Sequence, residues 1–83
     1  MKADLHRSWG RKVRDRRQAV GLTQIQLAEA ADTTQGTISR IEVGDIGPSD
    51  ELKWRLAGAL GLTVELLFPY PAVVPPTSTP RAS

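Results

Sequence analysis

The sequence contains no cysteine and only one histidine, His6, so it holds neither a disulfide framework nor a cluster of thiolate or imidazole ligands for a catalytic metal. It has no run of about 18 apolar residues that could cross a membrane, and residues 1–7 lack the apolar stretch of a secretory signal. We also find no paired carboxylates, no nucleophile–base set and no phosphate-binding loop. These absences predict a cytoplasmic domain that is not an enzyme, needs no cofactor or metal and does not contact a membrane.

Proline is scarce before residue 69, because five of the six prolines lie in residues 69–83. That segment has few side chains able to pack, so we expect a disordered, proline-rich tail. The length of 83 residues allows one small domain. Residues 1–68 are therefore the predicted folded domain.

The net charge is only +2, but the charges are unevenly distributed. Residues 1–20 carry seven basic and two acidic side chains, a net charge of +5, whereas residues 41–68 carry a net charge of −3. A basic N-terminal segment favours an anionic partner, although a solvated helix face has the same composition. Charge alone leaves both interpretations open.

Apolar spacing and capping signals predict five short helices and no strand, which makes the fold class all-α. The expected ranges are 5–19 (beginning at Leu5 or Ser8), 23–31, 34–43, 50–61 and 64–68. The second and third helices are separated by a very short turn, as in a helix-turn-helix, whose second helix enters the major groove of DNA.

The third predicted helix has a polar outward face. Ile38 and Ile41 form its apolar stripe, and the 100° step between residues then turns the opposite set outward. That outward set is Gly36, Ser39, Arg40 and Val43, with Gln35 and Thr37 at the exposed N-terminal end. Gln can pair with adenine and Arg with guanine through two hydrogen bonds each. Any amphipathic helix also turns polar residues toward water, so this pattern alone does not decide for DNA.

Three stretches carry a more specific signal: GRKVRDRR at residues 10–17, GLTQIQLA at 21–28 and TQGTISRIEVG at 34–44. With Pro48-Ser49, residues 56–61 and Leu66-Leu67, they resemble the phage-repressor and Cro-like helix-turn-helix family, also called the XRE family. The resemblance covers residues 10–68. It implies a compact five-helix bundle like that of lambda repressor, with the helix-turn-helix formed by the second and third helices.

The resemblance also implies roles for individual residues. Base contacts fall to Gln35, Gly36, Thr37, Ser39 and Arg40, and contacts to the DNA backbone fall to Thr23, Gln24 and Thr34. Arg17 and Glu42 match a structural pair that ties the first helix to the third. The loop 45–47 is not basic, so binding of phosphates is expected to depend on Arg11, Arg14, Arg16 and Arg17.

This chain departs from the family pattern at two positions. Gly36 replaces a longer polar side chain, which removes one direct base contact or permits a closer approach, for example of a thymine methyl. Lys53 stands near a position where relatives often have an apolar residue, so we expect Leu52 and Trp54 to take its place. Trp9 and Trp54 are both expected in the core or at its edge, and His6 on the surface.

We therefore predict a transcription regulator that binds duplex DNA sequence-specifically through the helix at 34–43, as a repressor of the phage-immunity or Cro-like kind. It is expected to bind an inverted repeat as a homodimer and to be monomeric when free. Leu67, Phe68 and Tyr70 either form a dimer contact or belong to a loose tail. The alternatives are an antitoxin, a restriction–modification controller, or an adaptor that docks a protein partner through the tail.

Overall fold

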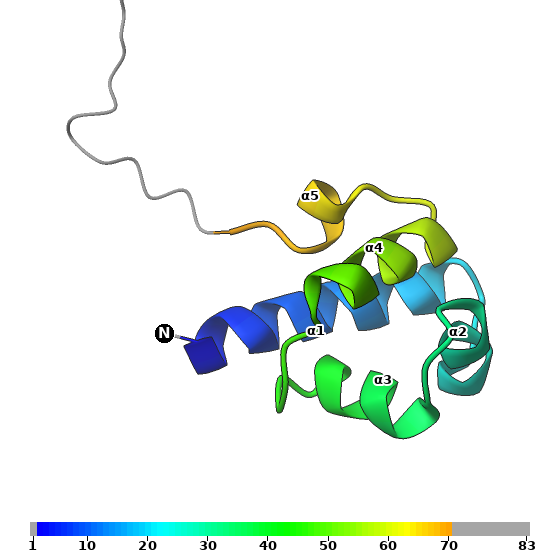
Figure 1. The fold of residues 1–83 in the computed structure, drawn as a ribbon, viewed down its shortest axis with the longest axis horizontal. Helices are drawn as coiled ribbons and strands as arrows, with labels where there is room; N and C mark the ends of the chain where they lie inside the picture. The colour runs from blue at the N-terminus through cyan, green and yellow to red at the C-terminus, as the bar shows by residue number, and fades with distance from the viewer. Residues whose placement is uncertain (1, 71–83) are drawn as a thin grey trace, which may run out of the picture.

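The computed structural model describes residues 2–70, and these form five α-helices and no strand. The helices are α1 (Lys2–Ala19), α2 (Gln24–Ala30), α3 (Gln35–Glu42), α4 (Asp50–Ala59) and α5 (Val64–Leu67). The all-α prediction is confirmed (Figure 1). The first helix begins at Lys2, before the predicted start, since nothing between Lys2 and Leu5 breaks a helix and Asp4 suits the positive end of the helix dipole.

The boundaries of the later helices follow from local hydrogen bonds. Four of them begin at a hydroxyl side chain that accepts a backbone N–H three residues on, which satisfies a donor that the first turn of a helix leaves unpaired. These N-cap residues are Thr23, Thr34, Ser49 and Thr63. Glycines with positive φ end three helical segments, at Gly21, Gly44 and Gly61.

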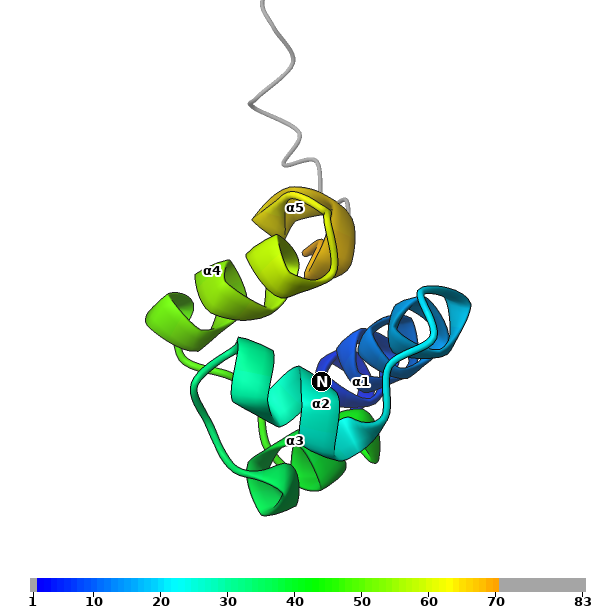
Figure 2. The same cartoon turned by 90° about the vertical axis from the view of Figure 1, so that its right-hand side faces the viewer.

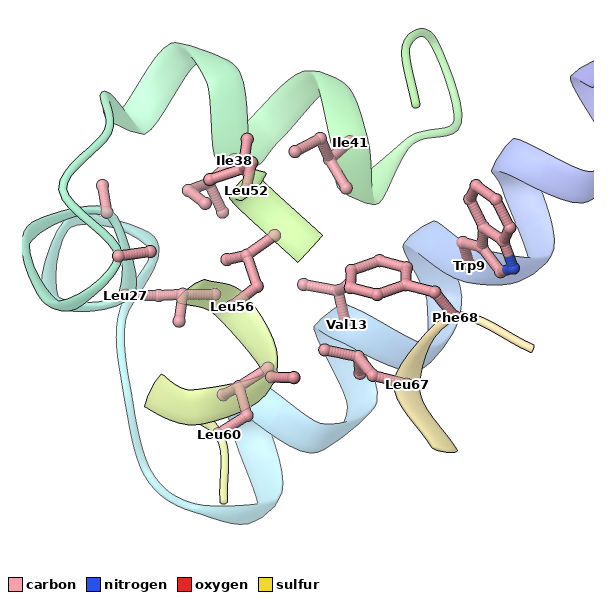
Figure 3. Packing of buried hydrophobic residues seen from close by; sticks show 13 residues of the cluster. Trp9, Val13, Leu27, Ile38, Ile41, Leu52, Leu56, Leu60, Leu67 and Phe68 are labelled. Carbon is pink, nitrogen blue, oxygen red and sulfur yellow. The ribbon is translucent and has the colours of Figure 1, made fainter. Parts of the chain in front are cut away.

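A single hydrophobic core lies between the helices. Val13 of α1, Leu27 of α2, Ile38 of α3 and Leu56 of α4 are each fully buried, and they converge from four directions (Figure 3). Phe68, which follows α5, closes the core beside Trp9, with the two rings edge to face at a centroid distance of 5.6 Å. The core therefore fixes α3 against both α1 and α2.

Gly10 lies where α1 comes very close to the backbone of α3. A Cβ atom at Gly10 would overlap the carbonyl oxygen of Ile41 and lie 2.6 Å from that of Glu42, so only glycine allows α1 to lie directly on the C-terminal end of α3. In Figures 1 and 2, α3 lies on one side of α1 and α5 on the other. The outer surface of α3 is therefore left uncovered by the rest of the fold.

Lys53, not Trp54, occupies the inward position of α4, which corrects the expectation for both residues. The Lys53 side chain is buried with its ammonium 4.3 Å from the centroid of the Trp9 ring, and it donates to the Tyr70 hydroxyl at 3.0 Å. Trp54, one 100° step farther round the helix, is 74% exposed. Trp9 is buried, as expected.

His6 is half-buried rather than fully on the surface. Its ring lies 5.8 Å from that of Trp9, and it packs so closely on Gly47 that a Cβ there would come within 2.7 Å of the His6 Cδ2 atom. The sequence reasoning missed this contact because His6 and Gly47 are brought together only by the packing of α1 against α3.

Packed residues continue past the predicted boundary at residue 68. The indole nitrogen of Trp9 donates to the carbonyl oxygen of Pro69 at 2.7 Å, and Tyr70 lies edge to face on Trp9. The predicted disorder of the tail concerns residues 69–83, of which 71–83 lie outside the described residues. The first two residues of that segment are held by α1 and α4.

Candidate nucleic-acid interface

The second and third helices form the two arms of a tight turn. The turn passes through Asp32 with φ of 55°, and the N–H of Thr33 donates to the carbonyl oxygen of Ala28 at 2.9 Å. Ala31, the C-cap of α2, and Ile38 of α3 are fully buried and belong to the same hydrophobic core. The geometry is that of a helix-turn-helix, as the short spacing of the two helices predicts.

The outward face of α3 presents the residues predicted to contact bases. Gln35, Gly36 and Arg40 are exposed, and Thr37 and Ser39 are half-buried at its edges. Val43, the C-cap residue, is exposed on the same face. The helix thus offers an amide, a guanidinium and two hydroxyls around a position without a side chain.

Gln35 is held by a chain of hydrogen bonds that crosses three helices. Its Nε2 atom donates to Gln24 Oε1 at 3.4 Å, and Gln24 Nε2 donates to Glu42 Oε1 at 3.0 Å. Arg17 completes the chain, with Nε donating to Glu42 Oε2 at 2.7 Å and Nη2 to Oε1 at 3.1 Å. The side chains of α1 and α2 therefore orient the N-terminal end of α3.

The Arg17–Glu42 pair is buried, with side chains 12% and 3% exposed. Arg17 also donates to the carbonyl oxygen of Leu22 at 2.8 Å, so its guanidinium is satisfied inside the protein. The hydrogen bonds to Glu42 raise the pKa of Arg17, while its burial opposes that shift. Because a raised pKa favours the protonated form of a basic group, the Arg17 guanidinium stays charged beside Glu42.

The two threonines predicted at the DNA backbone both cap helices. Thr23 accepts from the N–H of Gln26 at 3.0 Å, and its own N–H donates to the Gln26 side chain at 2.9 Å, which is a complete capping box. Thr34 accepts from the N–H of Thr37 at 3.2 Å, and the two threonine hydroxyls lie 2.9 Å apart. Both threonine side chains remain exposed and have lone pairs or protons left for a further partner.

The four arginines predicted to bind phosphates have different surroundings in the structure, and they do not form one phosphate-binding surface. Arg16 donates through Nε to the carbonyl oxygen of Leu60 at 2.9 Å, on the α4 side of α1, and Arg17 is held by Glu42. Arg11 lines a shallow surface hollow with Asp4 and Asp15, on the outer side of the helix. These three arginines are therefore engaged elsewhere or lie away from α3.

Arg14 is the member of this set that is exposed and close to the α3 side of the helix. It lies one turn beyond Gly10, the residue that touches α3, and so shares its face of α1. The sequence already predicts that these arginines point in different directions. Adjacent residues such as Arg16 and Arg17 differ by 100° around the helix, so both cannot face the same neighbouring helix.

The three residues predicted to form a dimer contact differ in exposure. Leu67 and Phe68 are core residues and have no surface to offer a partner, whereas Tyr70 is exposed, as is Leu66 of α5. Sequence spacing could not distinguish Leu66 from Leu67, because a four-residue helix is too short to define an apolar stripe.

Residues 2–70 contain neither a candidate metal site nor a candidate membrane span. No group of three or more His, Asp or Glu side chains is arranged to hold a metal ion. Nor does any helix of this part have the length and apolar character needed to span a bilayer. The features that remain are the polar face of α3 and the hydrogen-bond chain behind it.

A family model described as helix-turn-helix matches residues 13–67, which include the C-terminal part of α1 and all of α2 to α5. The chain belongs to this family of DNA-binding domains. It is a helix-turn-helix transcriptional regulator rather than an enzyme. In this domain α2 and α3 form the helix-turn-helix, and Gln24 of α2 is hydrogen-bonded to Gln35 of α3.

Known proteins with the same domain agree. An uncharacterized HTH-type transcriptional regulator from Methanothermobacter thermautotrophicus is 45% identical over 49 residues, which cover 59% of this chain and 71% of that protein. The clp gene regulator ClgR from Corynebacterium glutamicum is 33% identical, with a TM-score of 0.73 over 76% of this chain and 67% of that one.

The restriction–modification controller protein C.AhdI from Aeromonas hydrophila is 31% identical, with a TM-score of 0.75. The match covers 81% of this chain and 96% of the controller. The helix-turn-helix domain of this chain is therefore similar to regulators from different regulatory systems.

Proposed function

We propose that this helix-turn-helix protein binds a specific duplex DNA site by placing α3 in the major groove, and represses transcription by occupying a promoter. The observation that carries the proposal is the exposed polar face of α3 with Gln35 held in place by Gln24. Pre-oriented side chains distinguish bases better than free ones, because less conformational freedom is lost on binding. Such a protein works where the DNA lies, which is the cytoplasm of a bacterial or phage-infected cell.

Contacts with phosphates position the protein, and contacts with base edges select the sequence. Arg14 supports the first role, because it is the predicted phosphate-binding arginine that is exposed near α3. Gln35 and Arg40 support the second, since both are exposed on the outward face. Gln24 has a structural partner on each side, so its role is to orient Gln35 and, with its remaining amide N–H, to donate to a phosphate.

Binding as a homodimer to an inverted repeat follows from size. A single recognition module buries about 600–1,000 Å² on DNA, which is small for a tight specific complex. Two copies related by a twofold axis double that area and bind half-sites about one helical turn apart. Leu66 and Tyr70, exposed at the end of the domain away from α3, are the side chains that support a contact between copies there.

A restriction–modification controller is the second candidate function. The observation that favours it is the similarity to C.AhdI, which extends over 96% of that controller. Both candidates require the same DNA-binding mode, and they differ in the gene that is regulated.

The deciding experiment is selection of bound sites from random duplex DNA at a stated salt concentration. An inverted-repeat consensus recovered with the full chain, bound as two copies per site, would support the proposed function. Recovery of no enriched sequence would contradict it and favour a protein-interaction adaptor.

Substitution of Arg40 by alanine is expected to weaken binding to the selected site by about 1–3 kcal/mol and to relax the preference at one base position in each half-site. The reason is the loss of a guanidinium that can bond guanine through two donors. Arg11→Ala is the matched control, because Arg11 is also exposed but lies on the outer side of α1. Equal weakening on all sequences would mean that Arg40 contacts phosphate only.

Substitution of Arg14 by alanine is expected to reduce affinity for specific and non-specific DNA alike, and to lower the slope of log Kd against log salt by about 1. Arg11→Ala should leave the slope nearly unchanged, since Arg11 faces away from α3. Titrations at several salt concentrations measure both slopes. A larger loss for Arg11 than for Arg14 would reverse the assignment of the DNA-facing side of α1.

A further inference from the structure

Gly36 has no role in the fold that requires glycine. A Cβ atom built there would meet only Thr34 Oγ1 at 4.0 Å, and the residue has ordinary helical backbone geometry. Gly10 is sterically required and Gly44 has positive φ, whereas Gly58, like Gly36, is a helical glycine with open space around it. Glycine is also the poorest helix former after proline. The absence of a side chain at position 36 is thus a cost that nothing within the protein demands.

The position of Gly36 on α3 suggests a function for the missing side chain. It is the second residue of α3 and is exposed on the outward face, with Arg40 one turn farther along. The flanking side chains do not cover it, because the Gln35 amide is bonded to Gln24 and the Thr37 hydroxyl to Thr34. Gly36 therefore presents its nonpolar Cα hydrogens on the outward face, with open space where a side chain would stand.

We propose that Gly36 accommodates the 5-methyl group of a thymine, which selects thymine at one position of each half-site. This inference rests on the proposed function, namely major-groove binding by α3. Among the base edges in the major groove, the thymine methyl is the nonpolar group, so it matches the exposed nonpolar Cα of Gly36. The polar groups of Gln35 and Arg40 lie on either side of it along the helix and can contact the adjacent bases.

The test is a double-substitution cycle on the selected operator. Each thymine is replaced in turn by deoxyuridine, which lacks only the methyl group, and the wild-type chain and Gly36→Ala are titrated with each duplex. At one symmetric position, deoxyuridine should weaken wild-type binding by about fourfold, the value expected for one buried methyl group. With thymine present, Gly36→Ala should bind about tenfold more weakly than wild type, because two methyl groups then compete for one space.

The decisive measurement is the affinity of Gly36→Ala for the deoxyuridine duplex. On the deoxyuridine duplex, Gly36→Ala should bind within about twofold of wild type, since removal of the thymine methyl makes room for the new one. Gly58→Ala is the matched control: Gly58 is a helical glycine with open space around it, on α4 rather than α3. Both alanine variants should be at least as thermally stable as wild type, and only Gly36→Ala should lose affinity.

Two results with Gly36→Ala would overturn the inference while leaving the proposed function intact. One is Gly36→Ala binding the thymine operator as tightly as wild type, and the other is an affinity loss of equal size on both duplexes. Failure of any single thymine-to-deoxyuridine change to weaken the wild type would overturn it as well. If the wild-type chain selects no site, the proposed function fails and this inference with it.

Discussion

Gly10→Ala is expected to lower the free energy of unfolding by about 3 kcal/mol, at the upper end of the range for overpacked interiors. The added methyl group would overlap the carbonyl oxygen of Ile41, and a backbone atom cannot move aside as a flexible side chain can. The helices α1 and α3 would have to separate, which also disturbs the buried Arg17–Glu42 pair beside them. Urea denaturation followed by far-UV circular dichroism measures the effect.

The control for this substitution is Gly58→Ala. It makes the same change inside a helix where the added methyl meets nothing within 4 Å, so stability should rise by up to about 1 kcal/mol. The opposite signs separate steric overlap from helix propensity. Because a small domain has only about 5 kcal/mol of stability in total, the loss at Gly10 should be visible as a large shift of the midpoint. An unchanged midpoint would contradict the close packing of α1 on α3.

The features predicted correctly from the sequence are those with a local cause. The helices after α1 begin at Thr23, Thr34, Ser49 and Thr63, because each hydroxyl bonds to a backbone N–H only three residues away. The inward direction of Ile38 and Ile41 follows from the helix repeat alone. From these, the turn between α2 and α3 and the outward face of α3 could be predicted.

The features that were missed depend on residues far apart in the chain. Lys53 is buried because its ammonium lies on the ring of Trp9, 44 positions earlier, and helix periodicity contains no information about such a partner. Arg16 is bonded to Leu60, which removes it from the predicted phosphate-binding set. The pairing of Arg17 with Glu42 was implied only by the resemblance to a family, since the two residues are 25 positions apart.

The Arg17–Glu42 pair is also where a single change should damage the domain most. Glu42→Ala is expected to lower the free energy of unfolding by about 3–5 kcal/mol, because it leaves a buried guanidinium without its counter-charge. The guanidinium cannot lose its proton instead, since arginine remains protonated under all conditions in which the protein is folded. Gln24 loses its acceptor in the same step, so the brace behind Gln35 is weakened too.

Two control variants make the Glu42→Ala measurement specific. Glu51→Ala removes a carboxylate from an exposed pair with Arg55, and it should change stability by less than about 1 kcal/mol. The double variant Arg17→Met, Glu42→Leu removes both buried charges and should recover most of the stability lost by Glu42→Ala, since apolar residues of similar volume often replace a buried pair at little cost. If the double variant is as unstable as Glu42→Ala, the loss comes from the shape of the site and not from an uncompensated charge. If it recovers stability but selects its operator less strictly than wild type, the pair serves mainly to hold Gln24 and Gln35 in place for DNA.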